Sequence, residues 1–346
     1  ACNRIIASGY QLADNYAELF MADNGENPRA NKEIIFPVLF DGQTTQSYGM
    51  AAVILGSRSS SDFADVPAGI SGGWDGFRGT PELVRKFDFQ NNATPKANEI
   101  LDKRGIFFDK NRSIDITTSV TGTFTTEGWS VYKYTNVKSD GQPGSNTTFP
   151  DTDFPMFRLA DVYLMYAEAI YYVDNDEEQA REWLKKVLAR ACAVDWGLTL
   201  EKEEAVEQDG KAVTKRTYST YMTIQKNDAL TDELMLAYHK DDFIEELLEA
   251  RERELAFEGS RKYDLFRFNL LDTEIQNLID GRGDGKTYDC SYKKFGGDVI
   301  TYGVNSGPQT GIQSLQNNWK PYKMWLPIST LEISATNGKI VQNAKW

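Results

Sequence analysis

Apolar residues recur at helical spacing in two neighbouring stretches, 157–173 and 177–191, and in each they fall on one face of a helix. Asp174, Asn175 and Asp176 separate the two stretches. Asp176 is placed to cap the second helix, because its carboxylate can accept hydrogen bonds from the free backbone N–H groups of the first turn. The pattern predicts an antiparallel helical hairpin, the unit of tetratricopeptide-like solenoids. No further copy follows at a fixed period, so the pattern does not predict a solenoid.

Other segments predict shorter elements. Residues 33–40 form an apolar run in which Pro37 favours an edge strand, because proline cannot donate to a neighbouring strand. The remaining expectations are an amphipathic helix over 3–21 interrupted near Ser8 and Gly9, a short helix over 81–89, short strands within 106–137 (notably 129–134), a charged loop over 200–217, and a long helix over 241–271 that bends or breaks at Gly259.

These segments predict a mainly α fold in which tetratricopeptide-like hairpins pack against a β-poor region of long loops. The helical scaffold is expected in 1–40 and 157–271, and the loop-rich regions in 41–150 and 280–325. Long ordered loops are uncommon and are often functional. No linker separates independent folding units, so residues 1–346 are expected to form a single domain.

Charge and composition narrow the function. The net charge of −13 and the scattered basic residues argue against nucleic-acid binding, which needs clustered Lys and Arg. One histidine, His239, argues against a Ser-His-Asp triad or a multi-histidine metal centre. Three distant cysteines suggest neither a disulfide framework nor a zinc site. No stretch is long and apolar enough to cross a bilayer, and the first ten residues do not resemble an export signal.

Three segments, in order, resemble the SusD/RagB family. RERELAFEGSRKYDLFRFN (251–269) resembles the family's ER-x-x-ELAFEG-x-R-x-x-DL-x-R signature. FRLADVYLMYAEAI (157–170) resembles its R-L-A-D-x-x-L-x-Y-A-E-A helix, and the ending LPISTLEI…QNAKW (326–346) is similar to its P-I-P-x-x-E-I…N-P-G-W. Weaker similarities, at GGWDGFRGTPELV (72–84) among others, extend over nearly the whole chain.

The resemblance implies a SusD-like fold and a non-catalytic lipoprotein on the surface of the outer membrane. Such proteins bind an oligosaccharide or polysaccharide and pass it to a SusC-like TonB-dependent transporter. The resemblance also implies that this chain is the C-terminal majority of a family member. The lipid anchor would then lie upstream and be the only link to the membrane, and Cys2 would be a helix residue.

The acidic and basic residues of the signature favour structural ion pairs over catalysis. Carboxylates and arginines three or four residues apart share one face of a helix, and ion-pair networks imitate perturbed active sites. A glycosidase would need two carboxylates opposed across a sugar, and the sequence nominates no such pair. We therefore expect no catalytic residue, and structural ion pairs among Glu254, Glu258, Arg261, Asp264 and Arg267.

The loop GGWDGFRGTP (72–81) is the first candidate for ligand binding. Its glycines bring Trp74 and Phe77 out of regular structure, where aromatic rings can stack on the apolar faces of sugars. Asp75 and Arg78 are placed to hydrogen-bond sugar hydroxyls. Alternatively, Trp74 folds back and anchors the loop, because large aromatic side chains are mostly buried.

Other aromatic residues in loops form a second rank of ligand-binding candidates: Trp129, Tyr292, Trp319 and Tyr322. Residues 280–286 do not fit the start of a calcium-binding EF-hand loop. Arg282 stands at the third position, which needs an oxygen ligand, and Ser291 at the twelfth, which needs a glutamate. No metal or cofactor is therefore expected. The alternative function is a tetratricopeptide-like adaptor that binds a protein segment, for which several repeated hairpins would be expected. An enzyme ranks third.

Overall fold

The computed structural model describes residues 1–54, 69–70, 73–74, 78–79, 83, 86–87, 102, 104, 129–131, 133–192, 194–208, 211–224, 228–280, 292–293, 299–300, 317–324, 327–336 and 339–343. The chain divides into two compact units, Ala1–Gly259 with Tyr292–Ile300, and Ser260–Ser291 with Thr301–Trp346. Each unit is described by itself. The prediction that residues 1–346 are a single domain depends on how the units are joined and stays a prediction.

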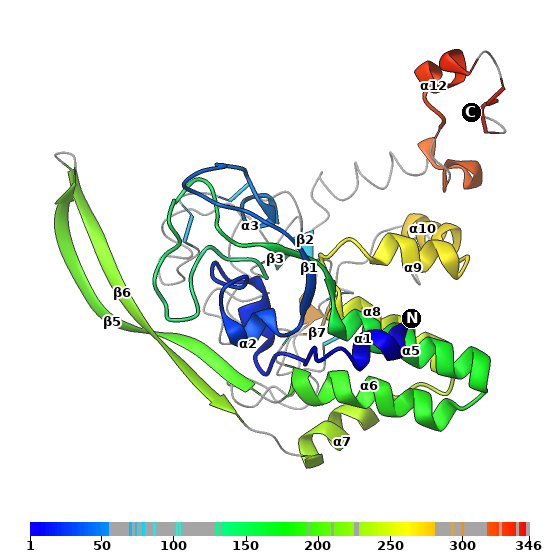
Figure 1. The fold of residues 1–346 in the computed structure, drawn as a ribbon, viewed down its shortest axis with the longest axis horizontal. Helices are drawn as coiled ribbons and strands as arrows, with labels where there is room; N and C mark the ends of the chain where they lie inside the picture. Colours follow the sequence, from blue (N-terminus) through cyan, green and yellow to red (C-terminus); the bar gives the residue numbers. More distant parts are fainter. Residues whose placement is uncertain are drawn as a thin grey trace. The chain divides into compact units, whose positions relative to one another are not determined.

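The helical hairpin of the first unit consists of α5 (Leu159–Ala169) and α6 (Glu177–Ala191), which lie side by side in Figure 1. A turn of π-helix, Ile170–Asp174, extends α5. Asn175 then reverses the chain in the left-handed conformation, with φ 53°. The Asp176 carboxylate accepts a hydrogen bond from the Gln179 backbone N–H at 2.9 Å. The predicted hairpin and its N-cap are both confirmed.

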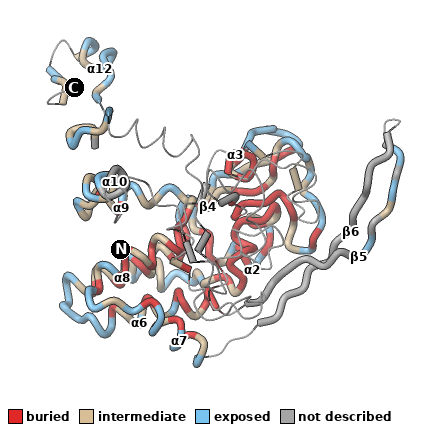
Figure 2. The backbone as a smooth tube through the Cα atoms, turned by 180° about the vertical axis from the view of Figure 1, so that it is seen from behind, coloured by how far each residue is buried: buried red, intermediate tan, exposed pale blue. Residues whose placement is uncertain are grey.

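The hydrophobic core of the first unit forms where α8 (Phe243–Glu254) packs on this hairpin. Helix α7 (Asp228–Tyr238) packs on the end of α6 through a second cluster that includes Leu188 and Leu234. Buried residues line α6 and α8, and they also gather around α2 (Pro28–Asn31) and α3 (Met50–Ile54) (Figure 2). The expectation of a mainly α fold is confirmed.

A two-stranded antiparallel sheet leads into the hairpin. Strand β1 (Ile34–Val38) pairs with β4 (Phe154–Arg158), and Pro37 lies in β1 opposite Pro155. Both strands of a two-stranded sheet are edges, so the predicted edge strand is confirmed. Helix α5 follows β4 directly and begins at Leu159, two residues later than the sequence pattern predicts.

One prediction near the N-terminus is wrong. The helix expected over 3–21 is only α1 (Cys2–Ile6), followed by a separate 3₁₀ helix, Tyr16–Phe20. The first helix ends at Ile6, and Gly9, three residues later, adopts φ 100°. The Asn15 side chain caps the second helix by accepting a hydrogen bond from Ala17 N.

The charged loop expected over 200–217 is instead an antiparallel hairpin of β5 (Val194–Gln208) and β6 (Lys211–Ile224). Glu203 pairs in register with Arg216, and Glu204 with Lys215. The backbone hydrogen bonds that join two antiparallel strands do not depend on the charge of the side chains. A charge-rich sequence can therefore form a ribbon, and Asp209-Gly210 between the strands is a typical hairpin signal.

The long helix expected over 241–271 ends at Glu254, and α9 (Arg261–Arg267) begins after a break. Phe257 and Gly259 both have positive φ within this break, at 61° and 83°. The predicted interruption at Gly259 is thus present. Most of the helix expected over 81–89 lies outside the described residues.

Short elements complete the two units. The first contains the strand pairs β2 (Arg78–Gly79) with β3 (Trp129–Ser130), and β7 (Tyr292–Lys293) with β8 (Val299–Ile300). The second contains α9, α10 (Leu271–Asp280), a 3₁₀ helix Pro321–Met324 and α12 (Thr330–Ala335). Among the described residues, no helix has the length and apolar character needed to span a bilayer.

The N-cap of α6 provides a test of the helical hairpin. We expect Asp176→Ala to lower the free energy of unfolding by about 1 kcal/mol, because the helix loses the acceptor for a backbone N–H group. Asp176→Asn should retain most of the stability, since asparagine caps equally well. Urea unfolding followed by circular dichroism measures the difference. Equal losses in the two variants would contradict a capping role.

Candidate functional site

Three aromatic side chains from separate loops lie together on the surface of the first unit. The ring centroids of Trp74 and Tyr48 are 4.8 Å apart, and those of Tyr48 and Phe149 are 4.9 Å apart. Trp74 is 57% exposed and Tyr48 46% exposed, so water reaches both rings. These three residues are called the aromatic platform. Exposed rings in contact with one another offer an apolar surface for stacking.

Asp151 joins the two loops that carry Tyr48 and Phe149. Its carboxylate accepts from Gly42 N at 2.8 Å, from Ser145 N at 2.5 Å and from Ser145 Oγ at 2.6 Å. Gly42 is required here, because a Cβ at this position would lie 2.3 Å from the Phe149 carbonyl oxygen. The backbones of the two loops are therefore in close contact beneath the rings.

Asn136 holds three segments near the platform. Its buried amide donates from Nδ2 to the carbonyls of Gly69 and Asn146, and its Oδ1 accepts from Asp151 N at 2.8 Å. Gly69 has φ 71°, and a Cβ there would lie 1.8 Å from the Asn136 carbonyl oxygen. Trp74 N donates to the carbonyl of Ala52, at 2.8 Å, in α3. Backbone hydrogen bonds and close packing thus fix the loops that present the rings.

The other first-rank candidates are only partly described. Asp75 and Phe77 lie outside the described residues. Arg78 is on β2, paired in register with Ser130, and Gly79 is paired with Trp129 on β3. The backbone therefore brings the segments of Arg78 and Trp129 together, while their side chains lie outside the description.

The remaining aromatic candidates lie elsewhere. Tyr292 is on β7, opposite Ile300, and its side chain is not described. Trp319 and Tyr322 belong to the second unit, where Trp319 Nε1 donates to Asp272 Oδ1 at 2.7 Å. Both side chains are half-buried. The indole of Trp319 thus holds a segment against α10.

Tyr48 and Phe149 were not among the candidates that the sequence suggested. Both lie in aperiodic segments, and their proximity depends on Asp151, which contacts Gly42 across 109 residues of sequence. The only local signal is an aromatic residue within a loop rich in glycine, serine and threonine.

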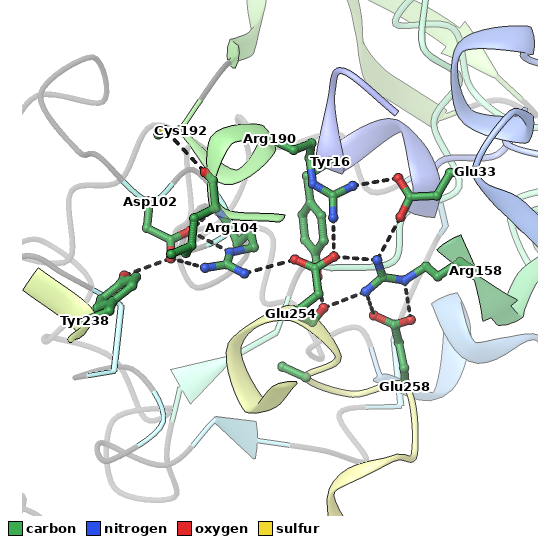
Figure 3. Close-up of polar contacts among 12 residues, drawn as sticks. Tyr16, Glu33, Asp102, Arg104, Arg158, Arg190, Cys192, Tyr238, Glu254 and Glu258 are labelled. Atoms are coloured by element: carbon green, nitrogen blue, oxygen red, sulfur yellow. Dashed lines mark hydrogen bonds and ion pairs between the residues drawn. The ribbon is translucent and has the colours of Figure 1, made fainter. Parts of the chain in front are cut away.

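A second group of side chains forms a buried cluster of charges, drawn in Figure 3. At its centre is Glu254, the last residue of α8. Its carboxylate accepts from Arg158 Nη1 at 2.5 Å, from Arg104 Nη1 at 2.9 Å and from Arg190 Nη2. Three arginines from different parts of the chain therefore meet at one carboxylate.

Arg158, at the end of β4, contacts three carboxylates at once. Its Nε and Nη2 each donate to the Glu258 carboxylate at 2.7 Å, a bidentate pair. Its Nη1 donates to Glu33 at 3.0 Å as well as to Glu254, and Arg190 on α6 also donates to Glu33, at 2.8 Å. The cluster therefore connects β4, α6, α8 and the residue that precedes β1.

Further side chains complete this buried charge cluster. Lys133 Nζ donates to Glu258 at 2.5 Å and to the carbonyl of Ala256 at 2.6 Å. Arg104 donates to both oxygens of Asp102, which also accepts from Tyr238 Oη. Four carboxylates face four cations: Glu33, Asp102, Glu254 and Glu258, with Arg104, Lys133, Arg158 and Arg190.

Burial acts to raise the pKa of Glu254, but the positive charges of Arg190, Arg158 and Arg104 outweigh it and hold the pKa well below its usual range. Burial also lowers the pKa of Lys133 to about 8, although attraction to Glu258 opposes this shift. The charged side chains of the cluster are at most 6% exposed. A permanently ionised and buried carboxylate suits ion pairing better than proton transfer.

Among the signature residues predicted to form ion pairs with one another, Glu254 and Glu258 have other partners, whereas Asp264 and Arg267 do pair. Glu254 and Glu258 bind Arg158, Arg190, Arg104 and Lys133, which come from distant segments. Asp264 and Arg267 form an ion pair at 3.2 Å within α9. Arg261 is the first residue of α9. In the described part of the chain, no group of three or more His, Cys, Asp or Glu side chains is arranged to hold a metal ion.

Comparisons with known proteins place this geometry in a family. Residues 32–346 match the family model described as the SusD family. The chain is 28% identical over 333 residues to the starch-binding protein SusD of Bacteroides thetaiotaomicron, covering 85% of this chain and 51% of SusD. The chain therefore spans about half the length of this curated relative.

Solved structures show the same fold. A SusD superfamily protein from Bacteroides vulgatus superimposes with a TM-score of 0.53 at 16% identity, over 100% of this chain and 57% of that one. A SusD-like protein from Bacteroides fragilis gives a TM-score of 0.50 at 17% identity, over 100% of this chain and 60% of that one. The SusD-like fold expected from the sequence is confirmed.

Removal of one charge from the buried cluster should be costly. We expect Arg158→Ala to lower the free energy of unfolding by about 3–5 kcal/mol, because Glu254 and Glu258 lose a buried partner. The control is Lys185→Ala, which removes a 2.6 Å pair with Asp232 at the surface and should cost about 0–1 kcal/mol. Urea unfolding measures both, and similar small losses would show that the cluster does not depend on Arg158.

The pKa of Lys133 predicts a pH dependence. Because its pKa is about 8 in the folded protein and about 10.4 in unfolded chains, the unfolded state binds more protons between these values. This lysine's contribution to stability should therefore rise as the pH increases from 8 towards 10.4, by on the order of 1–2 kcal/mol between pH 7.5 and 9.5. Unfolding at both pH values should show the increment in the parent and not in Lys133→Met. An equal increment in both would exclude Lys133 as its source.

Proposed function

The chain belongs to the SusD family, and from this premise we propose that it binds an oligosaccharide or polysaccharide on the aromatic platform without breaking a bond. The observation that carries the proposal is the exposure of Trp74 and Tyr48 in mutual contact on the surface. Sugars present apolar ring faces to aromatic side chains and many hydroxyl groups to nearby polar atoms. SusD, the curated relative, is named as a starch-binding protein, which supports a glycan as ligand.

The surroundings of the platform provide the polar groups that such a ligand needs. The loops beneath it expose the side chains of Gln43, Thr44 and Ser145, and the Gln43 amide Nε2 donates to the carbonyl of Ser145 at 3.0 Å. These neutral groups can exchange hydrogen bonds with sugar hydroxyls, directly or through water. Stacking would hold the ligand, and the polar groups would orient it.

We propose binding without catalysis because the charged signature residues have structural partners. Glycoside hydrolysis needs a carboxylic acid with a raised pKa opposite a second carboxylate across the sugar. Glu254 has the opposite property, since the neighbouring arginines lower its pKa, and it is fully buried. Incubation of the protein with oligosaccharides, followed by product analysis, would contradict this part of the proposal if shorter sugars accumulated.

The proposal extends to the cellular role that family membership suggests. We propose a lipoprotein on the outer-membrane surface that passes its glycan to a SusC-like TonB-dependent transporter. Affinity purification of the full-length protein from detergent-solubilised membranes should recover such a barrel. If none is recovered, handover is contradicted while glycan binding is unaffected.

Substitution of the platform provides the direct test. We expect Trp74→Ala and Tyr48→Ala each to weaken binding about tenfold, the effect of losing an aromatic contact of about 1–1.5 kcal/mol. Isothermal titration would use maltohexaose, laminarihexaose and a wider panel of plant and host glycans. The matched control is Phe36→Ala, which removes a ring on β1 that is 53% exposed and lies outside the platform.

The control variant should bind as the parent does. If Trp74→Ala and Tyr48→Ala also bind as the parent does, the glycan site is elsewhere on the protein. If no glycan in the panel binds, the proposed function is wrong for this chain.

A further inference from the structure

Two of the three segments that form the platform, 41–54 and 139–153, carry charges of one sign. Residues 41–54 contain one ionisable charged residue, Asp41, and no Lys or Arg. Residues 139–153 contain Asp140, Asp151 and Asp153, again with no Lys or Arg. The sequence of these loops thus places four acidic residues and no basic residue around Tyr48 and Phe149.

The carboxylates lie close to the rings. Asp151 is two residues from Phe149, so their Cα atoms are at most about 7.6 Å apart. Asp151 also binds the backbone of Gly42, the neighbour of Asp41. The carboxylate of Asp41 accepts from Gln43 N at 2.7 Å and Thr44 N at 2.8 Å, which keeps it on the loop that leads to Tyr48.

The pKa values of Asp41 and Asp153 are shifted in opposite directions, for different reasons. Backbone hydrogen bonds from Thr44 and Gln43 lower the pKa of Asp41, which is therefore charged at neutral pH. For Asp153, burial raises the pKa, and the negative charges of Glu26 and Asp151 raise it further against the backbone hydrogen bond from Phe40. Asp41 thus places a negative charge on the loop that leads to Tyr48, and Asp153 lies near the negative charges of Glu26 and Asp151.

Basic groups near these loops are few among the residues described. Lys138 directly precedes the second loop, and Asp140 follows it by two residues. Arg78 lies on β2, four residues after Trp74, and its side chain is outside the description. Within the described residues 41–54 and 139–153, the charged side chains are therefore all carboxylates, and Lys138 borders the second segment.

We propose that the platform accepts neutral or amino-substituted sugars and rejects sugars that carry carboxylate or sulfate groups. This inference rests on the proposed glycan binding and names its ligand class. An anionic sugar stacked on Tyr48 or Trp74 would bring its charge near Asp41 and Asp151. The platform provides stacking for any sugar ring, so the carboxylates determine which substituents it tolerates.

The size of the effect follows from Coulomb's law. Two like charges about 8 Å apart in water repel by enough to weaken binding about twofold. Two such carboxylates predict a loss of about fivefold for one anionic group at low salt. The Debye length is about 30 Å at 0.01 M salt and about 3 Å at 1 M, so the discrimination should disappear at high salt.

The test compares neutral glycans with their oxidised forms. A glycan array and titration at 10 mM and 1 M salt would use maltohexaose, laminarihexaose and other neutral oligosaccharides, each beside a derivative whose C6 hydroxymethyl groups are oxidised to carboxylates. The derivative should bind about fivefold more weakly at 10 mM salt and equally at 1 M. Partly deacetylated chitin oligosaccharides should gain affinity over acetylated ones at low salt.

Asp41→Asn separates charge from structure, because the asparagine Oδ1 can still accept from Gln43 N and Thr44 N. It should reduce the discrimination at low salt about twofold while binding neutral sugars as the parent does. The control is Glu178→Gln, which removes the same charge from α6 and should change nothing.

The outcomes distinguish the two proposals. Charge selection is supported if the protein binds neutral sugars more tightly than their oxidised forms and if Asp41→Asn reduces this difference in affinity. Oxidised sugars bound as tightly as neutral ones, or more tightly, would overturn charge selection and leave glycan binding intact. Binding of no sugar in either form would overturn the proposed function, and the inference with it.

Discussion

The buried charge cluster around Glu254 is the constraint on which the first unit depends. Removing an ion from water costs several kcal/mol, and only well-placed opposite charges and hydrogen bonds offset this cost. Here four carboxylates meet four cations, and Arg158 alone reaches Glu33, Glu254 and Glu258. Loss of any segment would leave a charge unpaired, so the segments must fold together. The cluster acts on their relative placement more than on net stability.

A short segment, residues 133–136, connects the buried charge cluster to the loops of the aromatic platform. Lys133 is bound to Glu258, and three residues later Asn136 binds the segments around Gly69, Asn146 and Asp151. Between them Thr135 N donates to the Phe20 carbonyl. Residues 133–136 therefore connect the helical framework to the loops of the exposed rings, through the backbone and its hydrogen bonds on either side. A preorganised site loses less conformational entropy when a ligand binds.

Sequence patterns predict what is local and miss what is distant. The hairpin and its cap at Asp176 follow from helical spacing within about thirty residues, because side chains three or four apart share a face. The same reasoning pairs Glu254 with helical neighbours, whereas its partner Arg158 is 96 residues away. Trp74 could be nominated from its loop alone, but Tyr48 and Phe149 reach it through contacts between distant segments, among them those of Asp151, Asn136 and Ala52. The β5–β6 hairpin was missed because its charged composition hid the alternation of a strand.

The family signature and the proposed ligand site thus consist of different residues, and different physical requirements act on them. The carboxylates of Glu254 and Glu258 are at most 6% exposed and are bound to arginines, so they are not available to contact a ligand. The loops 41–54 and 139–153 are constrained mainly at points where backbones touch, as at Gly42 and Gly69. Their exposed side chains can change without disturbing the fold. If the proposed site is correct, ligand selection lies in those loops, and the resemblance that identifies the family carries little information about the sugar.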